Sequence, residues 1–221
     1  MPLEMLLIVL LGVTGGAVAS TVLLPAWAPA LTVSLIGPEP KAYWYLSRSS
    51  AFVAYGLLWV AMIFGLLMTS KTARLWPGGP TAYDVHQHTS LLGLAFSLLH
   101  ALVLLGDRYI GFTLGEVLTP FGGAYERLWV GLGQIGFYGL AAVALSFYVR
   151  EQIGRAAWRA IHIISFGVFA LALLHGITSG SDSGSGWAGA IYWTSSGSVL
   201  FLTIYRALMA WGRGERRLTG M

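Results

Sequence analysis

The 221-residue sequence contains no cysteine and few charged residues. The lack of cysteine excludes disulfides, thiolate metal sites, iron–sulfur clusters and the C-x-x-C-H attachment of c-type haem. Charged residues make up 10% of the chain, whereas 56% of it is hydrophobic and the mean hydropathy is +0.71. This composition excludes an ordinary soluble domain and indicates an integral membrane protein in contact with a lipid bilayer.

Long apolar runs occur six times along the chain. A helix needs roughly 20 apolar residues to cross a hydrocarbon core about 30 Å thick. We therefore predict an all-α bundle of six transmembrane helices, forming one domain over residues 1–221. The first run is expected to be a helix rather than a cleaved secretory signal, because no Lys or Arg precedes it. The predicted helices span residues 3–24, 47–69, 84–105, 128–149, 157–177 and 187–209.

Lys and Arg gather in three segments: between the second and third helices, between the fourth and fifth, and after the sixth. The positive-inside rule places these segments and both termini in the cytoplasm, in what we expect to be a bacterial cytoplasmic membrane. No nucleic-acid partner is expected, because no soluble domain carries these basic residues. They are Lys71, Arg74, Arg150, Arg155, Arg159, Arg206, Arg213, Arg216 and Arg217.

The connecting segments differ in composition. The aromatic and aliphatic residues of 106–127 predict a segment that lies in the membrane interface or folds over the outer helix ends. The Gly/Ser-rich stretch 178–186 predicts a flexible outer loop. The stretch Gly131-Leu-Gly133-Gln-Ile-Gly136 matches G-x-G-x-x-G, but no strand precedes it. It therefore predicts close helix packing rather than a dinucleotide site, as do Gly12 and Gly16.

All five histidines lie in two of the predicted helices. His86, His88 and His100 belong to the third, and His162 and His175 belong to the fifth. Both helices are expected to run from the inside to the outside. The spacings of 14 and 13 residues correspond to about 21 and 20 Å along an α-helix. The sequence therefore predicts two levels, each with one histidine from each helix.

Facing imidazoles predict a metal cofactor at each level. An ionisable side chain inside a membrane is costly and is usually functional. Two neutral imidazoles that face each other supply the axial ligands of a bis-histidine haem iron. We expect His86 with His162 at the inner level and His100 with His175 at the outer level. The alternative is that these histidines only form hydrogen bonds between helices.

The angular positions of the histidines around an ideal helix support the arrangement for the third helix but not for the fifth. On an ideal helix His86 and His100 lie about 40° apart, whereas His162 and His175 lie about 140° apart. The fifth helix must therefore tilt or distort, or the two haems must be offset around it. Gly167 is the candidate position for a distortion.

Further polar residues are candidates for supporting roles. His88 is the rival of His86 as inner ligand; otherwise it is expected to be a polar interface residue or a donor to a haem propionate. The second ring nitrogen of each ligand is expected to bond a backbone carbonyl or a hydroxyl such as Ser97 or Ser165. Four arginines are candidates for pairing with haem propionates, or act only as topology determinants: Arg155 and Arg159 near the inner level, and Arg108 and Arg127 near the outer level.

These residues carry a family resemblance. The spacings H-x13-H and H-x12-H, in HQHTSLLGLAFSLLHALVLLGD and SFYVREQIGRAAWRAIHIISFGVFALALLHGITSGSDS, resemble the ferric reductase-like transmembrane superfamily. That superfamily includes the NADPH oxidase core and the bacterial haem-binding subunit of methionine sulfoxide reductase. SRSSAFVAYGLLWVAMIFGLLMTS and LTPFGGAYERLWVGLG extend the similarity, and Trp158 before His162 with Gly176 after His175 is its most specific part.

The resemblance implies a six-helix bundle with two stacked b-type haems between the third and fifth helices. His86 and His162 would ligate the inner iron, and His100 and His175 the outer iron. Such proteins carry electrons across the membrane. Many continue into a flavin and nicotinamide domain that this sequence does not contain, so we expect an oxidoreductase subunit reduced by another protein, by free reduced flavin or by quinol, with an acceptor outside. The alternative is a structural or accessory subunit of a respiratory or photosynthetic complex.

Overall fold

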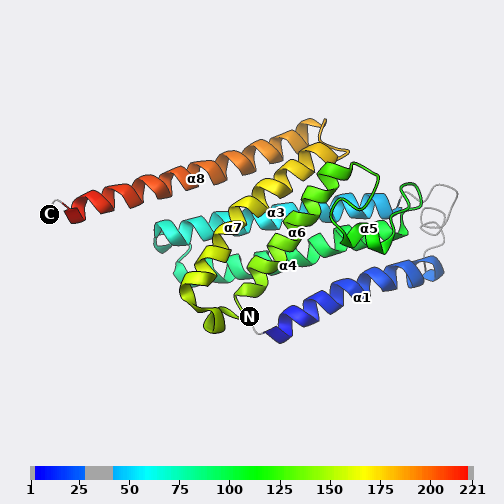
Figure 1. Ribbon diagram of the computed structural model, residues 1–221, viewed down its shortest axis with the longest axis horizontal. Coiled ribbons are helices and arrows are strands. Elements are labelled where there is room, and N and C mark those ends of the chain that lie inside the picture. Colours follow the sequence, from blue (N-terminus) through cyan, green and yellow to red (C-terminus); the bar gives the residue numbers. More distant parts are fainter. Residues whose placement is uncertain (1–2, 28–41, 219–221) are drawn as a thin grey trace.

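The computed structural model describes residues 3–27 and 42–218, which are helical and contain no strand. Six long helices occupy the six predicted positions (Figure 1). They are α1 (Leu3–Trp27), α3 (Ala42–Ser70), α4 (Gly79–Val103), α6 (Arg127–Ser146), α7 (Arg150–Ser179) and α8 (Gly186–Leu218). The connections hold the short helix α5 (Leu114–Leu118) and two 3-10 turns, η1 (Thr72–Arg74) and η2 (Leu104–Gly106).

Several of these helices fit a membrane. Within the described residues, four segments are long and apolar enough to cross a bilayer: Ala42–Ser70, Gly79–Gly106, Arg127–Ser146 and Arg150–Ser179. α1 is a helix of 25 residues, and its stretch Leu3–Gly16 is apolar among the described side chains. The all-helical, membrane-type fold is therefore confirmed, and the count of six spans stays a prediction.

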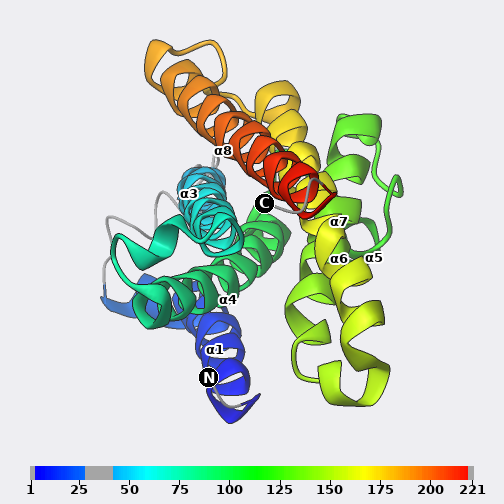
Figure 2. The same ribbon diagram turned by 90° about the vertical axis from the view of Figure 1, so that its left-hand side faces the viewer.

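The bundle is built from two helix pairs. α3 packs along α4, and α6 packs along α7. Figure 2 shows the two pairs side by side, with α8 against α3 and α1 against α4. By contrast, α4 and α7 do not pack along one another. These are the two helices that carry the histidines, so the histidines lie along the seam between the pairs.

One apolar cluster holds the pairs together. The ring of Tyr55 stacks on Phe169 of α7 at 5.8 Å between centroids, and its hydroxyl lies 2.5 Å from Ser195 Oγ of α8. Because lipid tails are as apolar as these side chains, the cluster stabilises through close contact rather than through the hydrophobic effect. Its buried members are Tyr55, Leu58, Met62, Leu66, Leu94, Leu140, Val168, Phe169, Ala188, Tyr192 and Val199.

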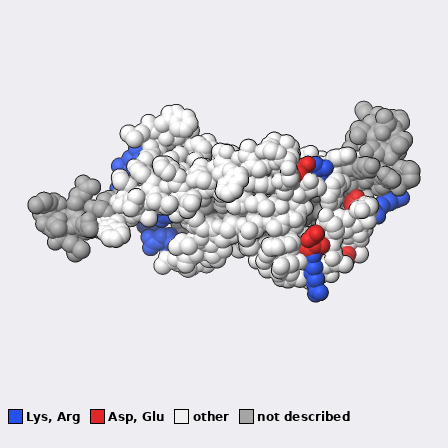
Figure 3. Space-filling model, turned by 90° about the horizontal axis from the view of Figure 1, so that it is seen from above, with Lys and Arg blue, Asp and Glu red and all other residues white. Residues whose placement is uncertain are grey.

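Charged side chains lie at the two ends of the bundle. On the face drawn in Figure 3, the end nearest the C-terminus carries Lys and Arg, the other end carries both signs, and the middle is uncharged. This distribution suits a protein whose middle contacts lipid tails.

Candidate functional site

Two histidine pairs face each other across the seam. The rings of His86 and His162 have centroids 6.0 Å apart and an interplanar angle of 65°. The rings of His100 and His175 have centroids 6.1 Å apart and an interplanar angle of 67°. We call these the His86 level and the His100 level. The structure thus places the four residues in the two predicted pairs, while their role as ligands stays a prediction.

Backbone carbonyls orient three of the four rings. The Nδ1 of His86 lies 2.8 Å from the Ala61 carbonyl oxygen, and that of His175 lies 2.9 Å from the Trp129 carbonyl oxygen. The Nδ1 of His100 lies 2.9 Å from the Ser47 carbonyl oxygen. A carbonyl only accepts, so each Nδ1 carries the proton and each Nε2 keeps a free lone pair.

The suggested hydroxyl partners of these rings are not used. The Oγ of Ser97 donates to the Gly93 carbonyl of its own helix at 2.8 Å, as serine hydroxyls in helices often do. Ser165 forms no hydrogen bond with a histidine ring in the described part of the chain. The expected carbonyl partners are present, but they come from α3 and α6 rather than from the histidine-bearing helices.

His162 is held differently from the other three. Its ring forms no hydrogen bond within residues 3–27 and 42–218, and it stacks on Trp158 one turn earlier at 5.1 Å and 29°. Its orientation therefore depends on ring contact alone.

Two glycines make room for the rings. A Cβ at Gly133 of α6 would lie 2.6 Å from Nδ1 of His175, and a Cβ at Gly65 of α3 would lie 3.2 Å from Cε1 of His86. A Cβ at Gly136 would lie 3.3 Å from Leu171 Cβ, so the G-x-G-x-x-G stretch serves close packing, as predicted. A Cβ at Gly12 or Gly16 would meet nothing within 4 Å, so the same prediction for α1 is not supported.

The predicted distortion of the fifth helix lies elsewhere than at Gly167. The only non-helical residue inside α7 is Gly154, with φ 80° and ψ 159°. Residues from His162 to His175 are regular helix, so the suggestion of Gly167 was wrong. α7 crosses the bundle obliquely in Figure 1, in agreement with the predicted tilt, and the alternative of two haems offset around the helix stays a prediction.

The other predicted site residues lie apart from the ring pairs. His88 is exposed, and its Nδ1 bonds the Asp84 carbonyl of its own helix at 2.7 Å. Arg108 is exposed, and Arg127 donates from Nε to the Phe121 carbonyl at 2.8 Å. Arg155 and Arg159 are exposed near the start of α7. Their propionate contacts stay predictions.

The His100 level borders a partly open, mostly apolar pocket. A cavity of about 240 Å³ is lined by both rings of that level together with Gly133 and Gly136 of α6, Tyr55 of α3 and residues of α5. The segment 106–127 folds over it, as predicted. Gln134 of α6 donates to the carbonyls of Glu116 and Val117, at 2.6 and 2.8 Å, and Tyr138 donates to the Leu118 carbonyl.

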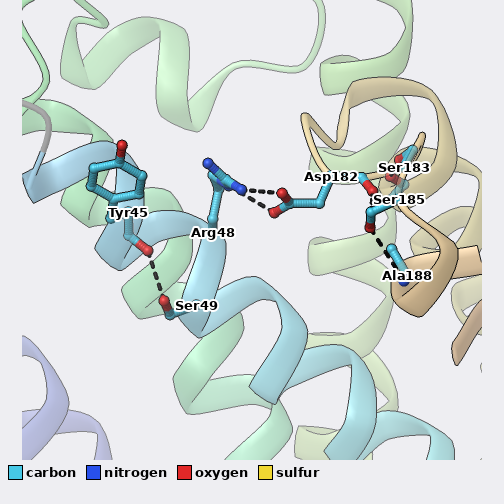
Figure 4. A network of polar contacts seen from close by, with 8 residues as sticks. Tyr45, Arg48, Ser49, Asp182, Ser183, Ser185 and Ala188 are labelled. Atoms are coloured by element: carbon cyan, nitrogen blue, oxygen red, sulfur yellow. Dashed lines mark hydrogen bonds and ion pairs between the residues drawn. The ribbon is translucent and has the colours of Figure 1, made fainter.

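A second segment closes the same level from the other side. The Nε of Arg48 donates to Oδ2 of Asp182 at 2.8 Å, and its Nη2 pairs with Oδ1 (Figure 4). Ser183 Oγ donates to the Gly176 carbonyl at 2.7 Å, and Ser185 Oγ accepts from the Ala188 amide at 3.4 Å. The carboxylate and hydroxyls of the 178–186 segment thus contact the neighbouring helices, while its predicted flexibility stays a prediction.

Comparison with known proteins gives one match. A family model described as a domain of unknown function, DUF8596, matches residues 42–182. No curated protein and no solved structure matches the chain. The matched range begins with α3 and ends at Asp182, so it contains both histidine pairs and the Arg48–Asp182 contact. Since this range covers more than half of its length, the chain belongs to the DUF8596 family.

Proposed function

We propose that this protein carries electrons across a membrane through two b-type haems, one held by His86 and His162 and the other by His100 and His175. A cytoplasmic or membrane donor reduces the His86 level, and an acceptor on the outer side takes the electron from the His100 level. In this proposal six helices span the membrane with both termini in the cytoplasm, as in the ferric reductase-like superfamily that the sequence resembles.

The main support for the proposal is the distance between the centroids of the two imidazole rings at each level. A bond between a first-row metal such as zinc and an imidazole nitrogen is about 2.0 to 2.1 Å, so two imidazoles on opposite sides of one metal have ring centres roughly 6 Å apart. The observed separations of 6.0 and 6.1 Å agree with that spacing at both levels. Edge-on contact between aromatic rings also falls in this range, as between Phe112 and Tyr125 at 6.2 Å, so the distances support ligation through the recurrence of two facing histidines at both levels.

The number of ligands favours haem over a bare metal ion. Each level offers two imidazoles, and no group of three or more His, Cys, Asp or Glu gathers within the described residues. A bare zinc ion usually takes four ligands, whereas haem iron brings four porphyrin nitrogens and takes two axial ligands from the protein. When bound in this way, haem supplies a one-electron couple with no open coordination position.

The surroundings of the rings suit ligation. Nδ1–H bonds to Ala61, Ser47 and Trp129 hold three rings in one tautomer and raise the basicity of each Nε2. The glycines opposite His86 and His175 leave space beside the rings. The cavity at the His100 level is lined mostly by apolar side chains, as the face of a porphyrin requires.

Haem stoichiometry tests the proposal directly. We expect two b-type haems per purified chain by pyridine haemochrome assay, and one in each of His86→Ala and His175→Ala. His88→Ala is the matched control, because His88 lies on the same helix two residues from His86 but is exposed, and it should retain both haems. Two haems in the His175 variant would refute the ligand assignment.

A second measurement separates an electron carrier from an accessory subunit. In proteoliposomes a carrier should be reduced by a donor on one side and reoxidised by an impermeant ferric acceptor on the other. A chain that binds haem without such turnover would be an accessory subunit.

A further inference from the structure

A second cavity lies at the start of α7, beside the His86 level. It measures about 540 Å³ and is lined by six residues: Arg150, Glu151, Gly154, Arg155, Trp158 and Arg159. None of the six is proposed as an iron ligand, although Arg155 and Arg159 are also predicted partners of haem propionates and Trp158 stacks on His162.

The break at Gly154 shapes this cavity. With φ 80° and ψ 159°, Gly154 turns the chain between a short first turn and the long remainder of α7. Arg150 and Glu151 lie before the turn, and Arg155 and Arg159 lie after it, yet all four line one cavity. A residue with a Cβ would be strained at this φ, so glycine is what the turn requires.

The cavity is positively charged and its charges are unpaired. Three arginines and one glutamate line it, and none of the four forms an ion pair within the described residues. The guanidinium of Arg150 lies 4.0 Å from the centroid of the Phe147 ring, which leaves its N–H groups available. Three guanidiniums around one space are suited to a group with several anionic oxygens.

Trp158 adds an unpartnered donor. Its Nε1 is buried and forms no hydrogen bond within the described part of the chain. A buried donor without a partner costs free energy, and the indole N–H can only donate. The missing partner must therefore be an acceptor. Trp158 also stacks on His162, so anything bound in this cavity lies one ring away from the His86 level.

We propose that this cavity binds a phosphate group, held by Arg150, Arg155 and Arg159 and by the indole N–H of Trp158. The phosphate belongs either to a soluble anion or to the headgroup of an anionic phospholipid at the membrane surface. Both sources present the same oxygens to the same donors, and basic pockets at helix ends are suited to either. The proposal does not depend on haem binding.

The test uses the full chain in nanodiscs of phosphatidylcholine. In one arm inorganic phosphate is titrated at constant ionic strength, and in the other a rising fraction of phosphatidylglycerol replaces phosphatidylcholine. The thermal unfolding midpoint reports binding, because a ligand that binds only the folded state raises it. We expect a saturable rise in one arm; a rise with phosphate indicates a soluble anion, and a rise with phosphatidylglycerol alone indicates a headgroup.

Variants assign the effect to this cavity. Arg155→Gln/Arg159→Gln should weaken binding at least about tenfold, and Trp158→Phe, which keeps an aromatic ring, about threefold to tenfold. Glu151→Gln should tighten binding about twofold to fivefold, because it removes the one opposing charge. Lys71→Gln/Arg74→Gln is the matched control, since it removes two positive charges between α3 and α4 without touching the cavity.

Two results would overturn the proposal. The first is no saturable rise in either arm, or a rise that the Arg155/Arg159 pair and the Lys71/Arg74 pair reduce equally. The second is loss of b-type absorbance in the Arg155/Arg159 variant with its phosphate response intact, which would assign these arginines to haem propionates.

Discussion

The two histidine levels have nearly the same separation between their rings, but the residues that surround the rings differ. Ring separations differ by only 0.1 Å, from 6.0 to 6.1 Å. At the His100 level both rings are fixed by carbonyl bonds, and the cavity is lined by α5 and by the paired Arg48 and Asp182. At the His86 level the ring of His162 has no hydrogen bond within the described residues and contacts the rings of Trp158 and His86.

The difference shows which parts of the chain each level depends on. The His100 level is completed by segments distant in sequence, so its geometry is set by tertiary contacts. The His86 level depends on the two histidine-bearing helices, α4 and α7, and on the Ala61 carbonyl of α3. Changes in the outer connections should therefore affect the His100 level selectively, and the predictions below separate the levels on that basis.

The largest difference is expected from glycine substitution beside the rings. In Gly133→Ala the new Cβ would lie 2.6 Å from Nδ1 and 2.7 Å from Cγ of His175, so the ring must move and lose its bond to Trp129. We expect a loss of about 1 to 3 kcal/mol in unfolding free energy, with loss of the haem at the His100 level. Thermal unfolding and haem stoichiometry measure the two effects.

Gly65→Ala and Gly56→Ala are the comparisons for that result. At Gly65 the nearest ring atom would be 3.2 Å away, so His86 needs to shift by only a few tenths of an ångström and the loss should be smaller. At Gly56 nothing lies within 4 Å, so the variant should be neutral or slightly more stable. Equal losses at Gly133 and Gly56 would show that the helix, and not the ring, is responsible.

Asp182→Asn should weaken the closure of the His100 level alone. It removes the charge that holds Arg48, in a pair whose side chains are 30% and 19% exposed. We expect about 1 to 2 kcal/mol of destabilisation and faster hydrogen exchange in residues 178–186. Glu126→Gln, an exposed carboxylate at the same end, should change neither quantity. Faster exchange near His162 instead would contradict the separation of the levels.

The sequence alone predicted the positions of the long helices and which histidines pair. Apolar runs of the right length predicted all six long helices, because a membrane leaves the backbone few alternatives. Spacing along α4 and α7 predicted which rings share a level, because helical rise per residue is nearly constant. His86 was favoured over His88 from phase alone, and the structure places His86 beside His162.

The surroundings of the rings could not be predicted in the same way. A carbonyl partner such as that of Ala61 or Trp129 has no side-chain signature, because every residue carries the same carbonyl. The Arg48–Asp182 contact joins residues 134 positions apart. Its one indication in the sequence was an arginine near the start of an apolar run, which needs a partner or water. The break in α7 at Gly154 could not be predicted, because a single glycine breaks a helix only where the tertiary structure requires it.

A smaller effect is expected from Ser47→Ala at the His100 level. The Ser47 Oγ donates to the His100 carbonyl at 3.1 Å and lies 2.9 Å from its Nδ1, while the carbonyl of Ser47 holds that nitrogen. The variant keeps the carbonyl, so we expect a loss of about 0.5 to 1.5 kcal/mol with haem retained. Ser50→Ala is the control, because Ser50 is buried on the same helix and bonds only its own backbone. A change in the haem spectrum in Ser50→Ala alone would contradict the assignment.

The smallest effect concerns acid and the α5 segment that covers the His100 level. Glu116 accepts hydrogen bonds from the amide and hydroxyl of Thr113, at 2.9 and 2.8 Å, and these bonds lower the pKa of its carboxyl below its usual 4.5. A carboxyl whose pKa is lowered by folding stabilises the fold above its unfolded pKa, and this contribution is lost as the pH falls through the folded value. Hydrogen exchange in residues 114–118 should therefore accelerate below about pH 4.5 relative to Glu116→Gln, which cannot titrate. Because Glu116 is partly exposed, water competes for these bonds and the change should stay confined to α5, with exchange around His86 unaffected. An equal pH response in Glu116→Gln would show that another group controls the opening of this segment.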